Sequence, residues 1–355
     1  MNVFPTHAPG TRFISKMINS QPHSQARSQA GSQARSYWTV GHEKGELRSE
    51  ELPAPGPGEA LVRALYSGIS KGTETVVHCG QVPPRVAEQM RAPLQEGSFP
   101  SPVKFGYLSV GIVEAGPDEW VGRTVFCLHP HQDRYVVPVD SLTKIPDGVP
   151  PRRAVLTGMV ETALNALWEA GPRLGDRVAV VGGGLLGGTL AALLRKFPLQ
   201  RLELVDVEPA KEQTAAALNI DFALPEDARA DCDIVFHCSA TPEGLRRSLQ
   251  LAGDEARVIE LSWFGDTPVS VPLGEDFHAR RLSITASQVG VVARARRHRR
   301  STAERLELAV QLLQDPAFDL FLSADTSFAE LPHMIEHLAA HGDGNSCHVI
   351  SYPEG

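Results

Sequence analysis

The chain has 355 residues, enough for two domains that each bury a hydrophobic core. Hydrophobic residues make up 42% and charged residues 21%, the balance of a globular protein, and the formal net charge of −8 argues against a general nucleic-acid or membrane-surface binder. Five scattered cysteines with no Cys-x-x-Cys pair exclude a disulfide framework and a structural zinc knuckle, and they favour a reducing, cytoplasmic setting. We therefore expect neither a nucleic acid nor a membrane as partner, which leaves a small-molecule substrate open.

Residues 1–36 differ in composition from the rest of the chain. The tract SQARSQAGSQARS repeats QARS, and the whole segment has four basic residues and no acidic one. Such a segment cannot bury apolar surface, so the sequence predicts a disordered tail. Its Ser-rich, acid-poor character is typical of a transit peptide. The alternatives are an unstructured tail and a start site that was assigned too far upstream.

From Tyr37 to about residue 155 the sequence predicts a barrel-like β domain. Short alternating segments are separated by turns rich in Pro and Gly. The expected strands are Ala60–Ser70, Leu108–Glu114, Thr124–Cys127 and Tyr135–Val139.

After a helix over Ala154–Ala170 the pattern becomes α/β, because strands then alternate with helices. This alternation is typical of a doubly wound parallel sheet. The expected strands are Val178–Val181, Leu202–Asp206, Asp233–His237, Arg257–Leu261 and Leu282–Thr285, with helices near Leu185, over Pro209–Leu218 and over Pro242–Leu251.

The last part of the chain begins with a basic run, Ala293–Glu304, which is either a solvated connector or a face for an anionic substrate group. An amphipathic helix follows around Leu306–Leu313. A final helix, Leu331–Ala339, and a strand, Cys347–Tyr352, should return to the β domain.

The stretch RVAVVGGGLLGG carries the main functional signal. Gly182, Gly184 and Gly187 form a Gly-x-Gly-x-x-Gly pattern between a strand and a helix, where a phosphate can reach backbone N–H groups without intervening side chains. Leu185 and Leu186 lie inside the same turn. Asp206 ends the next strand, 24 residues after Gly182, near the spacing at which an acid binds ribose hydroxyls and repels a 2′-phosphate. The sequence therefore predicts NAD rather than NADP.

Five stretches in order resemble the medium-chain dehydrogenase/reductase superfamily of the zinc alcohol dehydrogenase type, from about Glu51 to the C-terminus. They are PAPGPGEALVRALYSGIS, RYVVPVDSLTKIPDGVP, RVAVVGGGLLGG with VDVEPAK, DIVFHCSATPEGL and FAELPHMIEHLA. The resemblance implies a GroES-like catalytic domain over residues 37–155 and 295–355, a Rossmann NAD-binding domain over 156–294, and an active site between them. It also implies a possible homodimer.

The departures from the superfamily pattern predict an enzyme without zinc. Catalytic-zinc members have a Cys before Gly-Thr-Asp, where GISKGTE has Ser70 or Lys71, and the His of their Gly-His-Glu is here Tyr107. Glu161 stands where some members have a carboxylate ligand, but zinc needs three protein ligands. GISKGTE with the following Gly-Tyr-x-Ser-Val-Gly is similar to the bacteriochlorophyllide a dehydrogenases, a branch that oxidises a hydroxyethyl group on a large pigment.

Four residues are the catalytic candidates, each with a simpler alternative. Thr73 matches the superfamily's proton-relaying hydroxyl, or is a turn residue; Tyr107 donates a proton, or is an aromatic wall. Lys71 places a charge beside the oxyanion, or is a surface lysine. Glu161 fixes Lys71 or orients a water, or only begins the crossover helix.

Further residues are expected near the cofactor or in the β domain. His237 and Cys238 end a strand on the cofactor side, and Trp263 could pack on the nicotinamide side. His129 and His131 could titrate near neutrality, but two ligands alone do not make a metal site.

Three functions remain open. The first is an NAD(H)-dependent oxidoreductase that interconverts an alcohol and a carbonyl without zinc. The second is a zinc-free quinone or enone reductase, and the third is a non-catalytic dinucleotide-binding regulatory protein. The retained Thr73–Glu74 and Glu161 favour the first.

Overall fold

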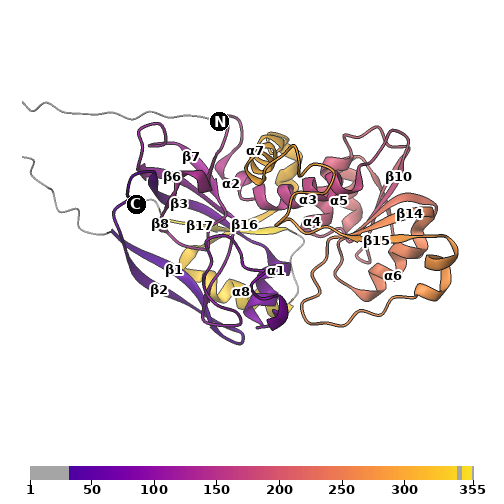
Figure 1. The fold of residues 1–355 in the computed structure, drawn as a ribbon, viewed down its shortest axis with the longest axis horizontal. Helices are drawn as coiled ribbons and strands as arrows, with labels where there is room; N and C mark the ends of the chain where they lie inside the picture. Colours follow the sequence, from indigo (N-terminus) through magenta and orange to yellow (C-terminus); the bar gives the residue numbers. More distant parts are fainter. Residues whose placement is uncertain (1–31, 342–345, 354–355) are drawn as a thin grey trace, which may run out of the picture. The chain divides into compact units, whose positions relative to one another are not determined.

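The computed structural model describes residues 32–341 and 346–353 (Figure 1). The predicted disordered tail lies outside these residues except for its last five, and for those the prediction is wrong. Strand β1 runs from Ser32 to Gly41, and Ala34 and Ser36 are buried. Pairing with β2 (Lys44–Leu52) forms this strand, and the low-complexity composition carries no signal of that partner.

The β domain contains two sheets. A four-stranded sheet has the order β2-β1-β5-β4, with β5 at Val103–Lys104 and β4 at Glu96–Gly97. A seven-stranded sheet has the order β16-β17-β3-β6-β7-β9, with β8 paired to β3. Its strands are β3 (Glu59–Ile69), β6 (Ser109–Ala115), β7 (Thr124–Cys127), β8 (Arg134–Pro138), β9 (Leu142–Lys144), β16 (Leu322–Ser327) and β17 (Cys347–Ser351). The strands predicted for this region are confirmed to within one or two residues.

Strand β3 is central to the second sheet, where it pairs with β17, β6 and β8. One of its faces is apolar. Ala60, Val62 and Ala64 are fully buried, and they alternate with half-buried neighbours. Helix α1 (Lys71–His78) follows β3 directly. From the other end of the chain, β17 pairs antiparallel with β3 and α8 (Leu331–His341) packs on the same core, as the sequence predicts.

The second half of the chain builds a six-stranded parallel sheet with the order β12-β11-β10-β13-β14-β15. Its strands are β10 (Arg177–Val181), β11 (Arg201–Val205), β12 (Asp221–Ala223), β13 (Cys232–His237), β14 (Ala252–Glu260) and β15 (Ser283–Ala286). Helices α4 (Leu185–Leu194), α5 (Lys211–Leu218) and α6 (Pro242–Leu251) connect these strands. The predicted doubly wound parallel sheet is confirmed.

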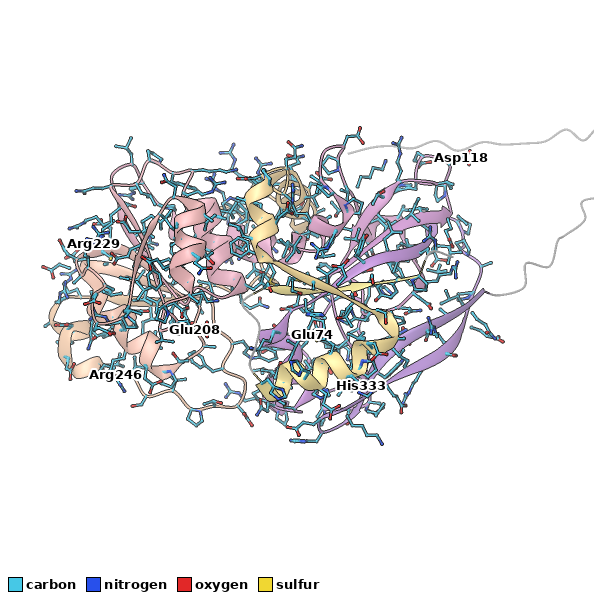
Figure 2. The ribbon with its side chains drawn as sticks, turned by 180° about the vertical axis from the view of Figure 1, so that it is seen from behind. Glu74, Asp118, Glu208, Arg229, Arg246 and His333 are labelled. Atoms are coloured by element: carbon cyan, nitrogen blue, oxygen red, sulfur yellow. The ribbon has the colours of Figure 1, made fainter. Side chains whose placement is uncertain are left out.

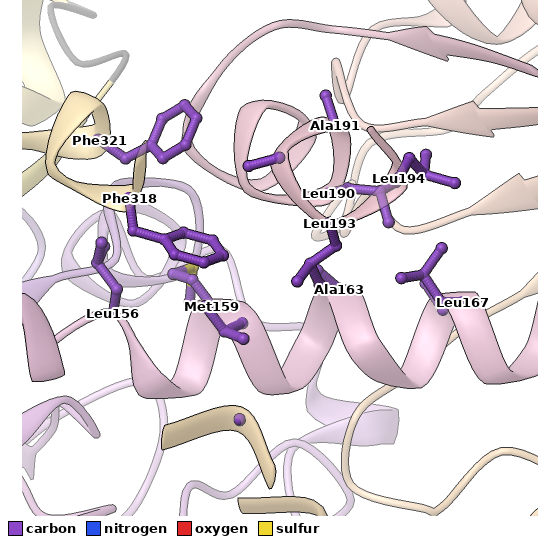
Figure 3. Close-up of a cluster of buried hydrophobic side chains, with 14 of the residues drawn as sticks. Leu156, Met159, Ala163, Leu167, Leu190, Ala191, Leu193, Leu194, Phe318 and Phe321 are labelled. Atoms are coloured by element: carbon purple, nitrogen blue, oxygen red, sulfur yellow. The ribbon is translucent and has the colours of Figure 1, made fainter. Parts of the chain in front are cut away.

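The largest core lies between this sheet and the helices that cover it. The single helix predicted over Ala154–Ala170 is α3 (Thr157–Ala170) in the structure, and a short helix, α2 (Pro151–Ala154), precedes it. Figure 3 shows Ala163 and Leu167 of α3 facing Leu190, Leu193 and Leu194 of α4, while Phe318 and Phe321 cover Leu156 and Met159. The helix α7 (Thr302–Leu312) adds Ala309 to the same core.

The basic run is on the surface. Residues 294–300 form turns whose side chains are exposed, and Arg300 pairs with Glu304 on α7. This placement agrees with a solvated connector. Over residues 32–341 and 346–353, no helix combines the length and apolar character needed to cross a membrane.

Candidate active site

The glycine-rich turn between β10 and α4 leaves the first N–H groups of a helix open. Gly182 has a φ of +102°, and a Cβ there would lie 2.7 Å from the backbone N of Ser239, so only glycine fits. Gly184 is the N-cap of α4, has no capping side chain, and has no heavy atom within 4 Å of an added Cβ. This turn can accept an anionic group against the helix N-terminus.

Asp206 follows β11 and closes one side of this turn. Its Oδ2 accepts a hydrogen bond from the backbone N of Gly183 at 2.6 Å, and its Oδ1 accepts from the N of Glu208 at 2.9 Å. The carboxylate is therefore fixed beside the phosphate-binding turn, where a ribose would meet it.

Lys211 on α5 is a charged neighbour of Asp206 that the sequence reading did not single out, although it ends the quoted stretch VDVEPAK. Its side chain is 4% exposed, its Nζ lies 3.9 Å from Glu208, and its Cγ lies 3.4 Å from a Cβ added at Gly183. Burial lowers the pKa of Lys211, and the like charge of Lys71 lowers it further.

Lys71 is the first residue of α1, and its repulsion of Lys211 places its charge on the side of the glycine-rich turn. Figure 2 shows Glu74 of the same helix on the β-domain side and Glu208 on the parallel-sheet side. Lys71 is therefore close enough to Lys211 for the two charges to interact, and its role beside a substrate oxygen stays a prediction.

His237 and Cys238 lie at the carboxyl end of β13, on the edge where β10 leads into the glycine-rich turn. His237 is fully buried and its Nδ1 bonds to both carboxylate oxygens of Glu260, at 2.9 and 2.8 Å. Burial raises the pKa of the Cys238 thiol far above its usual range, so this thiol stays neutral. Both residues are on the predicted edge.

Trp263 brings the parallel sheet's loops into contact with the β domain. It follows β14 and packs against a cluster formed by Val77, Val82, Val103 and Phe105, together with Tyr107. The indole and the predicted catalytic phenol of Tyr107 therefore pack against the same apolar cluster.

Tyr107 has two hydroxyl neighbours. Burial raises the pKa of its phenol to about 12, and hydrogen bonds from Ser70 and Thr73 partly oppose this rise. The ring packs edge-to-face on Phe105, with centroids 6.0 Å apart. The structure thus brings Tyr107 and Thr73 together, with Tyr107 as a neutral donor at physiological pH.

Glu161 pairs with Arg305 on α7, a partner that its expected role beside Lys71 does not include, and that role stays a prediction. Its Oε1 accepts from Nε of Arg305 on α7 at 2.9 Å, and both side chains are almost fully buried. The residue of α3 that faces Tyr107 is one helical turn earlier, at Gly158, where an added Cβ would lie 2.5 Å from Cδ2 of Leu108 and 3.8 Å from the Tyr107 ring.

Glu74 and His131 form a buried pair beneath α1. The Nε2 of His131 lies 2.9 Å from Oε2 of Glu74, and its Nδ1 lies 2.7 Å from Oγ of Ser67. Glu74 Oε1 also accepts from the N of Ser70, so it fixes the start of α1 next to Thr73. The sequence reading noted both residues without pairing them, because 57 positions separate them.

His129 does not titrate near neutrality as the sequence suggested. Its ring stacks on Tyr135 with centroids 3.8 Å apart, and burial lowers its pKa to about 3. Its imidazole is a neutral packing element.

The residues present do not fit a catalytic zinc ion. Where catalytic-zinc dehydrogenases have a Cys and a His ligand, this chain has Ser70 or Lys71 and Tyr107. The α3 position that faces Tyr107 is Gly158, and Glu161 is paired with Arg305. Across residues 32–341 and 346–353, no three His, Cys, Asp or Glu side chains are grouped so that they could hold a metal ion. Zinc requires thiolate, imidazole or carboxylate ligands in such a group.

The chain is similar to known dehydrogenases in sequence and fold, although no family model matches it. It is 27% identical over 301 residues to 2-desacetyl-2-hydroxyethyl bacteriochlorophyllide A dehydrogenase of Rhodobacter capsulatus, covering 75% of this chain and 90% of that protein. It is 24% identical over 253 residues to (R,R)-butanediol dehydrogenase of Bacillus subtilis, covering 59% and 72%.

A solved structure with the same fold is a zinc-binding dehydrogenase of Sinorhizobium meliloti bound to NADP, with a TM-score of 0.73, 19% identity, and coverage of 90% of this chain and 99% of that one. The architecture is thus a GroES-like domain with a Rossmann domain. The relatives of this chain are oxidoreductases, and its structure neighbours bind NAD(P) cofactors. The glycine-rich turn described above is of the kind that binds such a dinucleotide. The sequence relatives and structure neighbours of this chain are alcohol dehydrogenase-like members of the medium-chain dehydrogenase/reductase superfamily.

Proposed function

We propose that this protein transfers a hydride between NAD(H) and an alcohol or carbonyl substrate without a catalytic zinc ion. The observation that carries this proposal is the hydrogen bond from Gly183 to Asp206, which fixes an acid beside the phosphate-binding turn. A carboxylate there accepts ribose hydroxyls and repels a 2′-phosphate, which supports NAD over NADP.

The dinucleotide would be held by the glycine-rich turn, Asp206 and the two nearby lysines. Backbone N–H groups at the start of α4 suit the pyrophosphate, and Lys71 and Lys211 add positive charge near this turn. When bound, the nicotinamide accepts or donates the hydride.

Tyr107 is the proposed proton donor for carbonyl reduction. Its raised pKa keeps the phenol protonated, so its O–H can be given to the carbonyl oxygen as negative charge develops there. The hydroxyls of Ser70 and Thr73, which favour the ionised phenol, would stabilise the charge left on Tyr107. In this way hydroxyl groups take over work that a zinc ion does in other members of the superfamily.

The proposed substrate class is an alcohol carried by a larger apolar group. One relative's name gives a hydroxyethyl group on a bacteriochlorophyllide and another gives a butanediol, so an alcohol is common to both. Phe105, Tyr107 and Trp263 offer aromatic surface beside the proposed reacting atoms.

We further propose a reduced, cytoplasmic protein that forms a homodimer. The five cysteines are all free, which suits a reducing compartment. The domain division at residues 155 and 294 is part of the same proposal.

The test measures NADH and NADPH binding by fluorescence titration, then turnover on matched panels of alcohols, ketones, enones and quinones. We expect tighter NADH binding and turnover of a ketone or alcohol. Turnover confined to enones or quinones would favour the reductase instead. Binding without turnover on any panel would favour a regulatory dinucleotide-binding protein.

A further inference from the structure

Two neighbouring parallel strands end in a buried histidine and a carboxylate. His237 is the last residue of β13 and Glu260 the last of β14, and the two are register partners. The His237 side chain is fully buried and that of Glu260 is 13% exposed. The two loops that begin here both lie at the carboxyl edge of the sheet, where a dinucleotide binds.

Hydrogen bonds join this pair to the loops that follow both strands. Glu260 accepts from Nδ1 of His237 and from the backbone N of Ser262 at 2.7 Å. Nε2 of His237 lies within hydrogen-bond distance of Oγ of Ser239, at 2.7 Å. Glu260 thus holds the loop after its own strand and, through His237, the loop after β13.

Between these loops, Ala240 has a left-handed backbone with a φ of +53°. An L-residue with a Cβ disfavours this conformation. The N–H of Ala240 donates to Oγ of Ser262 at 3.0 Å, and this bond ties the left-handed residue to the loop after β14. The conformation at Ala240 is therefore held by the surrounding hydrogen bonds and opposed by its own side chain.

The held turn touches the phosphate-binding turn. A Cβ added at Gly182 would lie 2.7 Å from the N of Ser239 and 2.9 Å from the carbonyl carbon of Cys238. The N of Cys238 also donates to the carbonyl oxygen of Val181 at 2.8 Å. A change in the turn at Ala240 would therefore displace the backbone against which Gly182 packs.

We propose that His237, Glu260 and Ser262 are positioning residues that hold Ala240 in its left-handed conformation and so keep the cofactor edge in its binding geometry. These residues act through the turn Cys238–Thr241. The free energy of their hydrogen bonds offsets the unfavourable backbone conformation at Ala240. The inference rests on the proposed function, since it concerns the binding of the same dinucleotide.

Glycine at position 240 provides the decisive comparison, because glycine adopts a positive φ without a steric cost. We would measure NADH dissociation constants for the wild type and for the single variants Ser262→Ala, Glu260→Gln and Ala240→Gly. We would also measure them for two double variants, in which Ser262→Ala or Glu260→Gln is combined with Ala240→Gly. Ser262→Ala and Glu260→Gln should each weaken NADH binding about ten-fold in the alanine background. In the glycine background the same changes should weaken it by roughly three-fold or less, because no strained residue has to be held.

Glu203→Gln is the matched control. This buried carboxylate on β11 also accepts two hydrogen bonds, from N and Nε of Arg229, but it is not part of the network at Glu260. It should lower the melting temperature without changing NADH affinity. Ser262→Ala removes only a hydroxyl, so it remains informative if Glu260→Gln does not fold.

The outcomes separate the two claims. Equal losses of affinity in the alanine and glycine backgrounds, or no loss in either, would overturn this inference alone. A wild-type protein that binds neither NADH nor NADPH would overturn the proposed function, and this inference with it.

Discussion

The guanidinium of Arg305 reaches from α7 to the carboxylate of Glu161 on α3, with an Nε to Oε1 distance of 2.9 Å and side chains that are 2% and 5% exposed. Arg305 also donates from Nη1 to Oδ1 of Asn165 at 2.6 Å. Asn165 Oδ1 in turn accepts from the N of Ala293. The ion pair therefore anchors the chain that leaves the parallel sheet toward the exposed basic run.

Removing the positive partner should make stability depend on pH. Burial raises the pKa of Glu161, and Arg305 opposes that rise, so Arg305→Met raises the pKa further. A carboxyl whose folded pKa lies above its unfolded value keeps its stabilising contribution at low pH and loses it as the pH rises through the folded pKa. We expect Arg305→Met to cost about 3–5 kcal/mol at pH 8 and less at pH 5.5, measured by urea unfolding. A loss that is the same at both pH values would contradict this.

Glu161→Gln separates structure from catalysis at the same pair. The amide cannot compensate the buried guanidinium, so the melting temperature should fall. Because the carboxylate of Glu161 is paired with Arg305, we expect kcat with saturating NADH to stay within about three-fold of wild type. A fall in kcat of the size expected for an acid–base residue, at a temperature where the variant is folded, would restore Glu161 to the catalytic group.

Asp206→Asn should reduce the preference for NADH over NADPH. The amide oxygen can still accept from the N of Gly183, so the turn is kept while the charge that repels a 2′-phosphate is lost. We expect NADH binding to weaken and NADPH binding to improve, changing their ratio by about ten-fold, or about 1.4 kcal/mol. Separate fluorescence titrations with the two dinucleotides measure this ratio, and an unchanged ratio would remove Asp206 from cofactor selection.

Tyr107→Phe and Thr73→Val should both slow turnover. Loss of the phenol removes the proposed donor and should lower kcat by about 10²–10⁴-fold, with a smaller effect for Thr73→Val. Burial raises the pKa of Tyr107 to about 12, so its phenol stays protonated across the usual assay range. The wild-type rate of ketone reduction should therefore show no decline between pH 8 and 10 from Tyr107. Full activity in both variants would rule out this mechanism.

The sequence predicts the order of the fold well where the signal is local. Alternation in Ala60–Ser70 and the apolar run before Gly182 both mark real strands, β3 and β10. The glycine pattern and Asp206 also meet in space, because a parallel sheet places consecutive strand ends on one edge. By contrast, β1 begins inside a low-complexity tract, since pairing with β2 decides it and composition does not.

The parts of the site that sequence reasoning missed depend on long-range pairing. The family pattern alone suggests a catalytic role for Glu161. Its carboxylate is paired with Arg305, 144 residues away in the sequence, which that pattern does not reveal. His131 and Glu74 likewise pair across two elements of the β domain. Ala240 carries no sequence sign of its left-handed backbone, because alanine rarely adopts one and only the Ser262 hydroxyl nearby reveals how it is held.

The types of residue around Tyr107 predict a protein that holds no zinc ion at this site. An ammonium and a phenol with a raised pKa are poor zinc ligands at neutral pH, and Gly158 offers no donor atom on α3. We expect elemental analysis of dialysed protein to find well under one zinc ion per chain, and a chelator to leave turnover unchanged. Because the relatives include zinc-binding dehydrogenases, stoichiometric zinc that survives dialysis would show that ligands outside this group hold a metal, and Tyr107 would then lose its proposed role as the group that meets the substrate oxygen.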